Sequence, residues 1–242
     1  MNKLMKLLLA AGMCLGMMGC ASGAVQDNVS KVVEKKEKSK DVAWEVGDCT
    51  AKTWVNSIGT TWIQIACPVT NTGKKNLYLS AATMDLEDMD GHLVDSQSYV
   101  SAFPEVLKPG ETGYYFEETT LDEGMPTELK VLPHVNAKES KVDCIRFETS
   151  EISITDEQFG GVKVTGRVEN TTDEDHEFVY VVAFLYDANN QLIGSEFTIL
   201  NDELPAGDKI GFSMTGLGSP EWLTAGAVDH YEVFAYPQQY NF

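Results

Sequence analysis

One group of potential metal ligands that can be compared with a calcium loop is an acidic heptapeptide, Asp-Leu-Glu-Asp-Met-Asp-Gly, that ends at Gly91. If Gly91 is the sixth position of a calcium loop, Asp88 and Asp90 fit the third and fifth positions. Leu86 is then the first position and Gln97 the twelfth, and neither supplies the carboxylate that such a loop needs. We therefore expect a solvated hairpin tip, and we expect no bound metal or other cofactor.

Residue patterns typical of catalysis are equally sparse. The four histidines are scattered, and none stands at metal-ligand spacing from another histidine or from a pair of cysteines. The sequence has no Gly-x-Ser-x-Gly turn, and the glycine-containing segment 216–220 lacks the strand–helix context of a phosphate loop. These patterns argue against an enzyme. An unrecognised hydrolase ranks third among the possible functions, behind a surface binding module and an accessory subunit.

The position of Cys20 indicates a covalent modification. Lysines precede an apolar N-terminal stretch that is too short to span a bilayer with ease, and small Gly19 stands directly before the cysteine. This arrangement resembles a bacterial lipobox. It implies that residues 1–19 are a lipoprotein signal peptide, and that Cys20 becomes the acylated first residue, anchored through palmitate and further acyl chains. An ordinary secretory signal cleaved near Ala21 is the alternative.

The charge of the chain changes after its first 41 residues. Of 18 basic and 37 acidic residues, seven basic and four acidic precede Val42, so residues 42–242 hold 11 basic and 33 acidic residues, a net charge of −22. Such a body is a poor nucleic-acid binder and would be repelled by an anionic membrane. Residues 20–41 are polar and lysine-rich, which predicts a flexible spacer. We expect a lipid-anchored protein on the extracytoplasmic face of the cell membrane.

The body repeats itself at an offset of 99 residues, which relates Val-Thr-Asn-Thr around Asn71 to Val-Glu-Asn-Thr around Asn170. The offset also pairs Leu86 with Leu185 and Asp88 with Asp187, and after a two-residue loop difference it pairs Leu107 with Leu204 and Gly110 with Gly207. Agreement at strand cores and at turns together indicates two copies of one module, at residues 42–141 and 142–242.

Each copy has the pattern of short antiparallel strands. Ile63, Ile65 and Cys67 alternate with mostly polar neighbours, as residues of a half-buried strand do. The Asp-Gly pair ending at Gly91 predicts a hairpin, and the Pro-Gly pair ending at Gly110 predicts a type II turn. Helical periodicity is absent from the body. The sequence therefore predicts an all-β protein with two tandem immunoglobulin-like β-sandwich modules after a signal peptide and a flexible spacer.

The longest apolar run of the body, Val-Tyr-Val-Val-Ala-Phe-Leu-Tyr-Asp at residues 179–187, predicts a buried strand that enters a hairpin. A second turn, Leu-Pro-Ala-Gly-Asp, follows at residues 204–208. Together these segments resemble the FxLYD domain, an immunoglobulin-like module of prokaryotic cell-surface proteins, over residues 161–214. Ala183 departs from the family pattern, which usually has phenylalanine there, and the first copy keeps only the leucine and the final aspartate.

The three cysteines of the body are expected to be structural. Cys49 and Cys67 have their midpoint at residue 58, in a predicted turn, so a symmetric hairpin places them face to face. An exported location permits a disulfide. Cys49 with Cys144 is the alternative, because an Asp-Cys pair begins each copy. We favour the Cys49–Cys67 bond, which leaves Cys144 buried or free.

One strand of the second copy is apolar on both faces. In the first copy Met84 and Leu86 point inward because the other parity is polar, and the offset then sends Ala183 and Leu185 inward. The outward side chains are Tyr180, Val182, Phe184 and Tyr186. A contiguous apolar face usually marks an interface. We expect either a protein partner or a cover formed by a loop or by residues 236–242; packing of the first module there is a third alternative.

These observations favour a lipid-anchored cell-surface binding or structural module without catalytic activity. The alternative is an extracytoplasmic accessory subunit that assembles or regulates a membrane protein complex or an envelope enzyme. In both cases the expected partners are the membrane, through the lipid anchor, and a possible protein at the second module. Nucleic acid is excluded by the acidic charge.

Overall fold

The computed structural model describes residues 41–158, 160–216, 220 and 222–238. The predicted signal peptide, Cys20 and nearly all of the predicted spacer lie outside these residues. The described residues form antiparallel strands and one short 3₁₀ helix, Ala225–Ala227, so the expected all-β fold is confirmed. Within this described part of the chain, no helix is long and apolar enough to cross a membrane.

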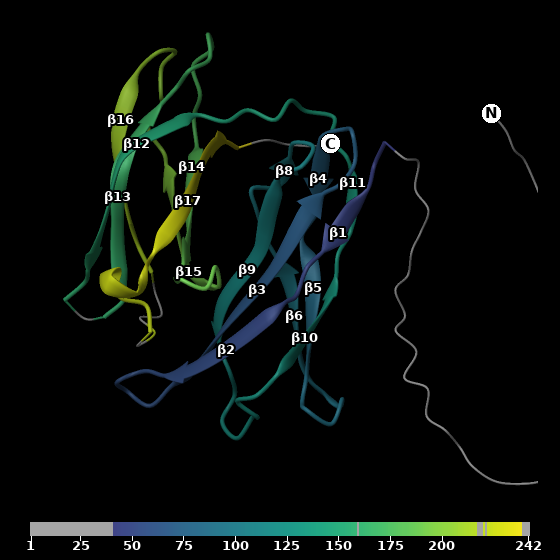
Figure 1. Cartoon of the computed structure of the whole chain (residues 1–242). Helices are drawn as coiled ribbons and strands as arrows, with labels where there is room; N and C mark the ends of the chain where they lie inside the picture. The colour runs from purple at the N-terminus through teal and green to yellow at the C-terminus, as the bar shows by residue number, and fades with distance from the viewer. Residues whose placement is uncertain (1–40, 159, 217–219, 221, 239–242) are drawn as a thin grey trace, which may run out of the picture. The chain divides into compact units, whose positions relative to one another are not determined.

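Strands β1–β11 form what we call the N-terminal half (Figure 1). Their bounds are β1 Trp44–Val46, β2 Thr50–Val55, β3 Thr61–Asn71, β4 Leu77–Leu79, β5 Ala82–Glu87, β6 Leu93–Val100, β7 Ala102–Phe103, β8 Val106–Leu107, β9 Thr112–Thr120, β10 Lys130–His134 and β11 Ala137–Glu139. One layer has the order β1-β3-β9-β7 with β2 also paired to β3, and the other consists of the sheets β10-β5-β6 and β11-β4-β8.

The core of the N-terminal half lies between its two layers. Strand β3 contributes fully buried Ile63 and Ile65, as the alternating pattern predicts, and β5 contributes Met84 and Leu86. Tyr115 of β9 is also fully buried, and its hydroxyl donates to the Ser80 carbonyl at 2.6 Å. These side chains form one continuous apolar cluster, so the layers are the two sheets of a β-sandwich.

Strands β12–β17 form the C-terminal half. Their bounds are β12 Glu148–Asp156, β13 Val162–Glu169, β14 Val179–Tyr186, β15 Leu192–Leu200, β16 Lys209–Thr215 and β17 His230–Pro237. Their sheets have the orders β12-β13-β16 and β15-β14-β17, with β14 beside both β15 and β17 (Figure 1). Val164, Ala183, Leu185 and Met214 pack in the core between these sheets. Among the described residues, strand pairing always joins two strands of the same half.

Two buried asparagines hold equivalent turns in the two halves. The Asn71 side-chain amide donates to the carbonyls of Lys75 (2.8 Å) and Leu107 (2.9 Å), and its backbone carbonyl accepts from Gly110 N–H. Asn170 makes the same set of bonds, to Glu174 (2.7 Å), to Leu204 (3.0 Å) and from Gly207. Both asparagines are 0% exposed, so these bonds satisfy side-chain amides that water cannot reach. The 99-residue repeat of the sequence is therefore also a repeat of hydrogen bonds.

Candidate functional site

The candidate site is the apolar outward face of β14, whose residues lie against the N-terminal half. Ala183 and Leu185 point into the core of the C-terminal half, whereas Val182, Phe184 and Tyr186 belong to a separate buried cluster. This cluster also includes Tyr236 of β17 and, from the N-terminal half, Phe103 and Tyr114, with Tyr180 and Phe234 at its margin. The face is thus covered by the first half of the body, the third of the alternatives that the sequence left open. We call it the aromatic interface.

Tyr114 of β9 is the central contact from the N-terminal half. Its ring lies 4.6 Å from the Phe184 ring and 6.4 Å from the Tyr186 ring, between centroids. The Tyr186 hydroxyl lies 3.0 Å from both the Tyr114 hydroxyl and Glu232 Oε2. Because a hydroxyl carries a single hydrogen, the order that satisfies all three groups is Tyr114 donating to Tyr186 and Tyr186 donating to Glu232. Burial raises the pKa of both tyrosines, so both stay neutral hydrogen-bond donors.

Tryptophans hold one end of the aromatic interface. The Trp54 ring of β2 stacks on Trp62 of β3 (6.0 Å) and meets Trp222 of the C-terminal half edge-on (5.4 Å). Trp222 Nε1 donates to the Ile193 carbonyl at 3.0 Å, which fixes the indole in that orientation. Nearby, Lys52 Nζ of β2 donates to a carbonyl of β15, and burial lowers the pKa of this lysine. Strand β2 therefore contacts the second half through both apolar and polar groups.

Arg146, in the segment between the halves, lies at the other end of the aromatic interface and contacts both halves. Its guanidinium forms a forked pair with Glu111, with Nη2 2.8 Å and Nε 3.2 Å from the two carboxylate oxygens, and Nη2 also donates to the Val106 carbonyl. The same group lies over the rings of Tyr236 (5.5 Å) and Phe234 (5.8 Å) of β17. Arginine suits this place because its planar fork pairs with a carboxylate while its face stacks on aromatics.

Buried acids lie at the same junction. Glu118 of β9 accepts a hydrogen bond from Gln64 Nε2 at 2.8 Å, and burial raises the pKa of Glu118. Glu196 of β15 is 2% exposed, and burial followed by the charge of Glu118 raises its pKa to about 8. Two buried side-chain atoms have no hydrogen-bond partner among the described residues, Trp62 Nε1 and Glu196 Oε2, and they belong to opposite halves.

The acidic hairpin tip has a structural role in both copies. Asp88, Asp90 and His92 bring their potential ligand atoms within 4.8 Å of one another. Asp88 Oδ1, however, accepts the backbone N–H groups of residues 90 and 92, both at 2.9 Å. Asp187 accepts the N–H groups of Asn189 and Gln191 at the same distances, in a turn without the other two ligands. The hydrogen bonds that close the turn therefore explain why an aspartate stands at this position in both copies.

The structure joins Cys49 and Cys67 in a disulfide across the β2–β3 hairpin, the pairing favoured from the sequence. Cys144 is a free thiol, so the alternative Cys49–Cys144 bond is not formed. Its Sγ lies 3.4 Å from the Val106 carbonyl, and burial raises the pKa of the thiol. A protonated, half-buried thiol of this kind is a poor nucleophile.

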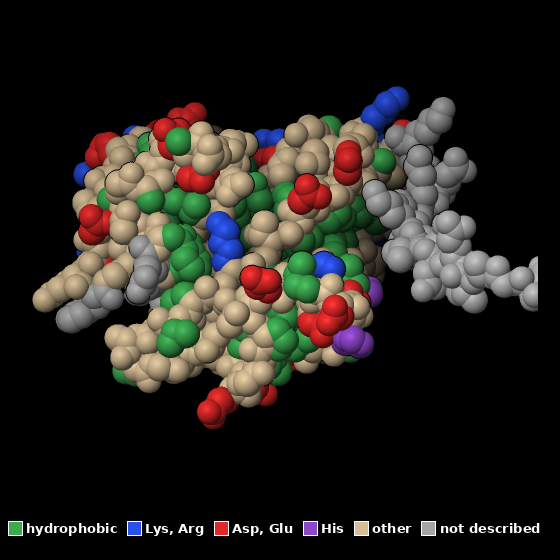
Figure 2. Space-filling model, turned by 60° about the horizontal axis from the view of Figure 1, so that its bottom comes forward, with side chains coloured by type: hydrophobic (Ala, Val, Ile, Leu, Met, Phe, Trp, Pro, Cys, Tyr) green, Lys and Arg blue, Asp and Glu red, His purple; other side chains and the backbone are tan. Residues whose placement is uncertain are grey.

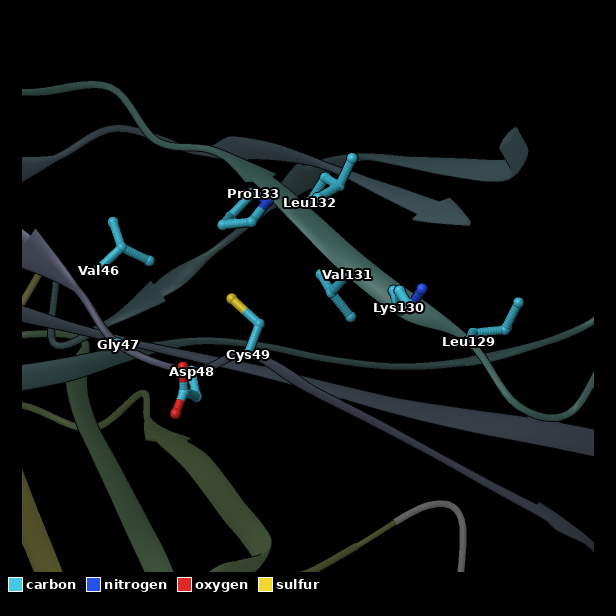
Figure 3. A pocket seen from close by; sticks show the side chains of 9 residues that line it. All are labelled: Val46, Gly47, Asp48, Cys49, Leu129, Lys130, Val131, Leu132 and Pro133. Atoms are coloured by element: carbon cyan, nitrogen blue, oxygen red, sulfur yellow. The ribbon is translucent and has the colours of Figure 1, made fainter. Parts of the chain in front are cut away.

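A groove opens beside the disulfide, between the β1–β2 turn and β10. Figure 3 shows Cys49 between Val46 and Val131, with the other lining side chains along the two walls. The lining residues are Val46, Gly47, Asp48, Cys49, Leu129, Lys130, Val131, Leu132 and Pro133. Among the described strands, β10 pairs with β5 alone, and Pro133 has no N–H to offer a further strand. A further strand placed in the groove could therefore form only part of the backbone hydrogen bonds along the edge of β10.

The sequence identified the β14 face but not the residues that cover it. The outward-facing residues of β3 and β9 could have been identified from strand alternation. Gln64 and Ala66 alternate with the core residues of β3, and Tyr114 and Glu118 both point outward from β9. The contacts of Arg146 could not be predicted, because nothing in the sequence between the halves indicates which groups its guanidinium contacts. No protein-family model matches the chain, and no curated protein sequence matches it.

Proposed function

We propose that this protein is a lipid-anchored scaffold on the extracytoplasmic face of the cell membrane, built to hold a two-module surface rather than to catalyse a reaction. The modules are immunoglobulin-like, and the second is of the FxLYD type. Acylation of Cys20 supplies the anchor, and residues 20–41 act as the spacer. The observation that carries the proposal is the aromatic interface, because it gives the two halves a large shared apolar contact.

A fixed pair of sandwiches suits binding better than turnover. Rigidity lowers the entropy that a partner must overcome when it docks on both halves. The groups whose pKa values are raised most are Tyr115, Tyr186, Tyr236 and Glu196, and burial is the main cause of each shift. On the face seen in Figure 2, acidic side chains are spread out with hydrophobic ones between them, a mixture that supports solubility outside the cell and leaves apolar contacts for a partner.

The alternative, an accessory subunit of a membrane complex, is favoured by the outer face of the β10-β5-β6 sheet. Leu93 is 63% exposed and Leu132 is 44% exposed, and the strand register places them on the same face as Asp85 and Glu87. Apolar residues set among carboxylates are typical of a protein docking surface with a basic rim on the partner.

The anchor and the partner are tested separately. Cys20→Ser should abolish incorporation of a palmitate analogue and move the protein from the membrane fraction to the medium or to an uncleaved precursor. Cys144→Ser is the matched control and should stay membrane-bound. A Cys20→Ser protein that is processed and sedimented with membranes like the parent would refute the lipoprotein assignment.

Cross-linking in intact cells addresses the partner. Recovery of one stoichiometric membrane complex that is lost in a Leu93→Asp/Leu132→Asp variant would select the accessory role. Recovery of extracellular ligands without a membrane partner would select the surface scaffold. A purified protein that turns over a small-molecule substrate would contradict both.

A further inference from the structure

Glu196 is a buried carboxyl without a positive counterpart. It is 2% exposed, and its Oε2 has no hydrogen-bond partner among the described residues. The chain makes room for the group: a Cβ built on Gly216 would lie 2.6 Å from Glu196 Oε1, so a side chain at residue 216 would collide with the carboxyl. A carboxyl that is accommodated but unpaired is costly to ionise.

The groups around Glu196 come from four strands. Its cross-strand neighbour on β14 is apolar Ala183, and Gly216 follows β16. From the N-terminal half, Glu118 of β9 exerts its charge on Glu196 and is itself held by Gln64 of β3. Glu117 adds a further negative charge near Glu118. Within the described chain, the charge that acts on Glu196 is therefore negative and comes from the opposite half.

We propose that Glu196 is a proton-binding site that makes the stability of the folded chain depend on pH. With a proton, the carboxyl is neutral and can be buried beside Glu118 without repulsion. Without the proton, a buried carboxylate has no hydrogen-bond partner for Oε2 among the described residues, and the charge of Glu118 opposes its own. Alkaline conditions therefore destabilise the folded chain, and conditions near or below neutrality stabilise it.

The direction of the effect follows from proton linkage. Burial first and then Glu118 raise the pKa of Glu196 from 4.5 to about 8. A carboxyl whose folded-state pKa is raised favours the folded state fully below its unfolded pKa, and this stabilisation is lost as the pH rises toward the folded pKa. The relevant window runs from about 4.5 to about 8. Between pH 6 and pH 9, the folding equilibrium constant should fall on the order of a hundredfold through this group.

The test uses the mature chain, residues 20–242, with Cys20→Ser so that no lipid is attached. Urea unfolding at pH 6 and at pH 9 gives the folding constants, and carboxyl ¹³C NMR gives the titration of Glu196. The parent should lose on the order of a hundredfold in the folding constant across this range, Glu196→Gln should lose little of it, and Glu118→Gln should lose an intermediate part. Glu203→Gln, at an exposed position, is the matched control and should behave like the parent.

Three results would overturn the proposal. The first is a Glu196 carboxyl that titrates near its ordinary value in the NMR experiment. The second is a Glu196→Gln protein that keeps the full pH dependence of the parent. The third is a parent protein that is stabilised at pH 9 by calcium chloride, with the gain abolished in Glu196→Gln, because the two carboxylates would then hold a cation and not a proton.

Discussion

Strands β5 and β14 occupy the same place in the two halves, yet their outward faces differ completely. Both send alternate residues into a core, Met84 and Leu86 in one half and Ala183 and Leu185 in the other. The outward set of β5 is Thr83, Asp85 and Glu87, and the outward set of β14 is Val182, Phe184 and Tyr186. Position 85 is half-exposed and polar, whereas its counterpart Phe184 is 0% exposed.

The difference separates the residues that build each half from the residues that join the two halves. The buried asparagine, the aspartate turn and the core parity recur in both halves, and they fix each sandwich. The outward face of one strand is free to vary without disturbing that frame. Apolar side chains there created the aromatic interface in one half, while carboxylates in the other half kept the same face in water.

The largest effect is expected at Phe184. Phe184→Ala should cost about 4 kcal/mol in the free energy of unfolding, because a fully buried aromatic ring is replaced by a cavity beside Tyr114. The counterpart change, Asp85→Ala, removes partly exposed hydrogen bonds to Ser96 and His134 and should cost about 1 kcal/mol or less. Urea unfolding followed by tryptophan fluorescence measures both. Equal costs for the two changes would break the contrast between the faces.

A second pair of substitutions tests what the halves share. Asn71→Ala and Asn170→Ala should each cost about 2 kcal/mol, because each removes two hydrogen bonds that a buried side-chain amide donates to backbone carbonyls. The two values should agree within about 1 kcal/mol, since the hydrogen bonds are equivalent. Thermal and urea unfolding give the numbers. A large cost in one half beside a negligible cost in the other would show that the repeat of hydrogen bonds is not a repeat of stabilisation.

A smaller effect is expected at the segment between the halves. Arg146→Lys keeps the charge but loses the fork to Glu111 and the stacking on β17, and should cost about 2 kcal/mol. Arg167→Lys, which alters an exposed pair with Glu151, is the control and should cost less than about 0.5 kcal/mol. Hydrogen exchange at β17 should rise in the first variant only. Equal hydrogen exchange at β17 in the two variants would show that Arg146 does not stabilise the interface.

Much of each half was predictable from local sequence pattern. Alternation placed Ile63 and Ile65 in a core, turn residues placed the hairpins, and the midpoint of Cys49 and Cys67 gave a bond that the structure contains. The parity of residues 180–186 followed from comparison with the first copy. These features depend on neighbours within one strand or one hairpin, which the sequence displays directly.

The contacts between the halves were not predictable in the same way. The β14 face was recognised as apolar, but a partner and a cover by a loop or the C-terminal residues were favoured over the first half, and the choice depends on how the two halves are oriented. Glu196 is the clearest omission. A glutamate in a strand predicts a solvated position, and only the approach of Glu118, Gly216 and the neighbouring strands makes it a buried group.

The contact between Tyr114 and Phe184 is the most direct test of the central claim, that the aromatic face of β14 joins the two halves. Their ring centroids lie 4.6 Å apart although the residues belong to different sheets and different halves. In a chain of residues 20–242 that carries Cys20→Ser and selectively labelled aromatic rings, we expect nuclear Overhauser cross-peaks between the Tyr114 and Phe184 ring protons near neutral pH. Absence of these cross-peaks, with independent tumbling of the two halves in ¹⁵N relaxation, would contradict the account.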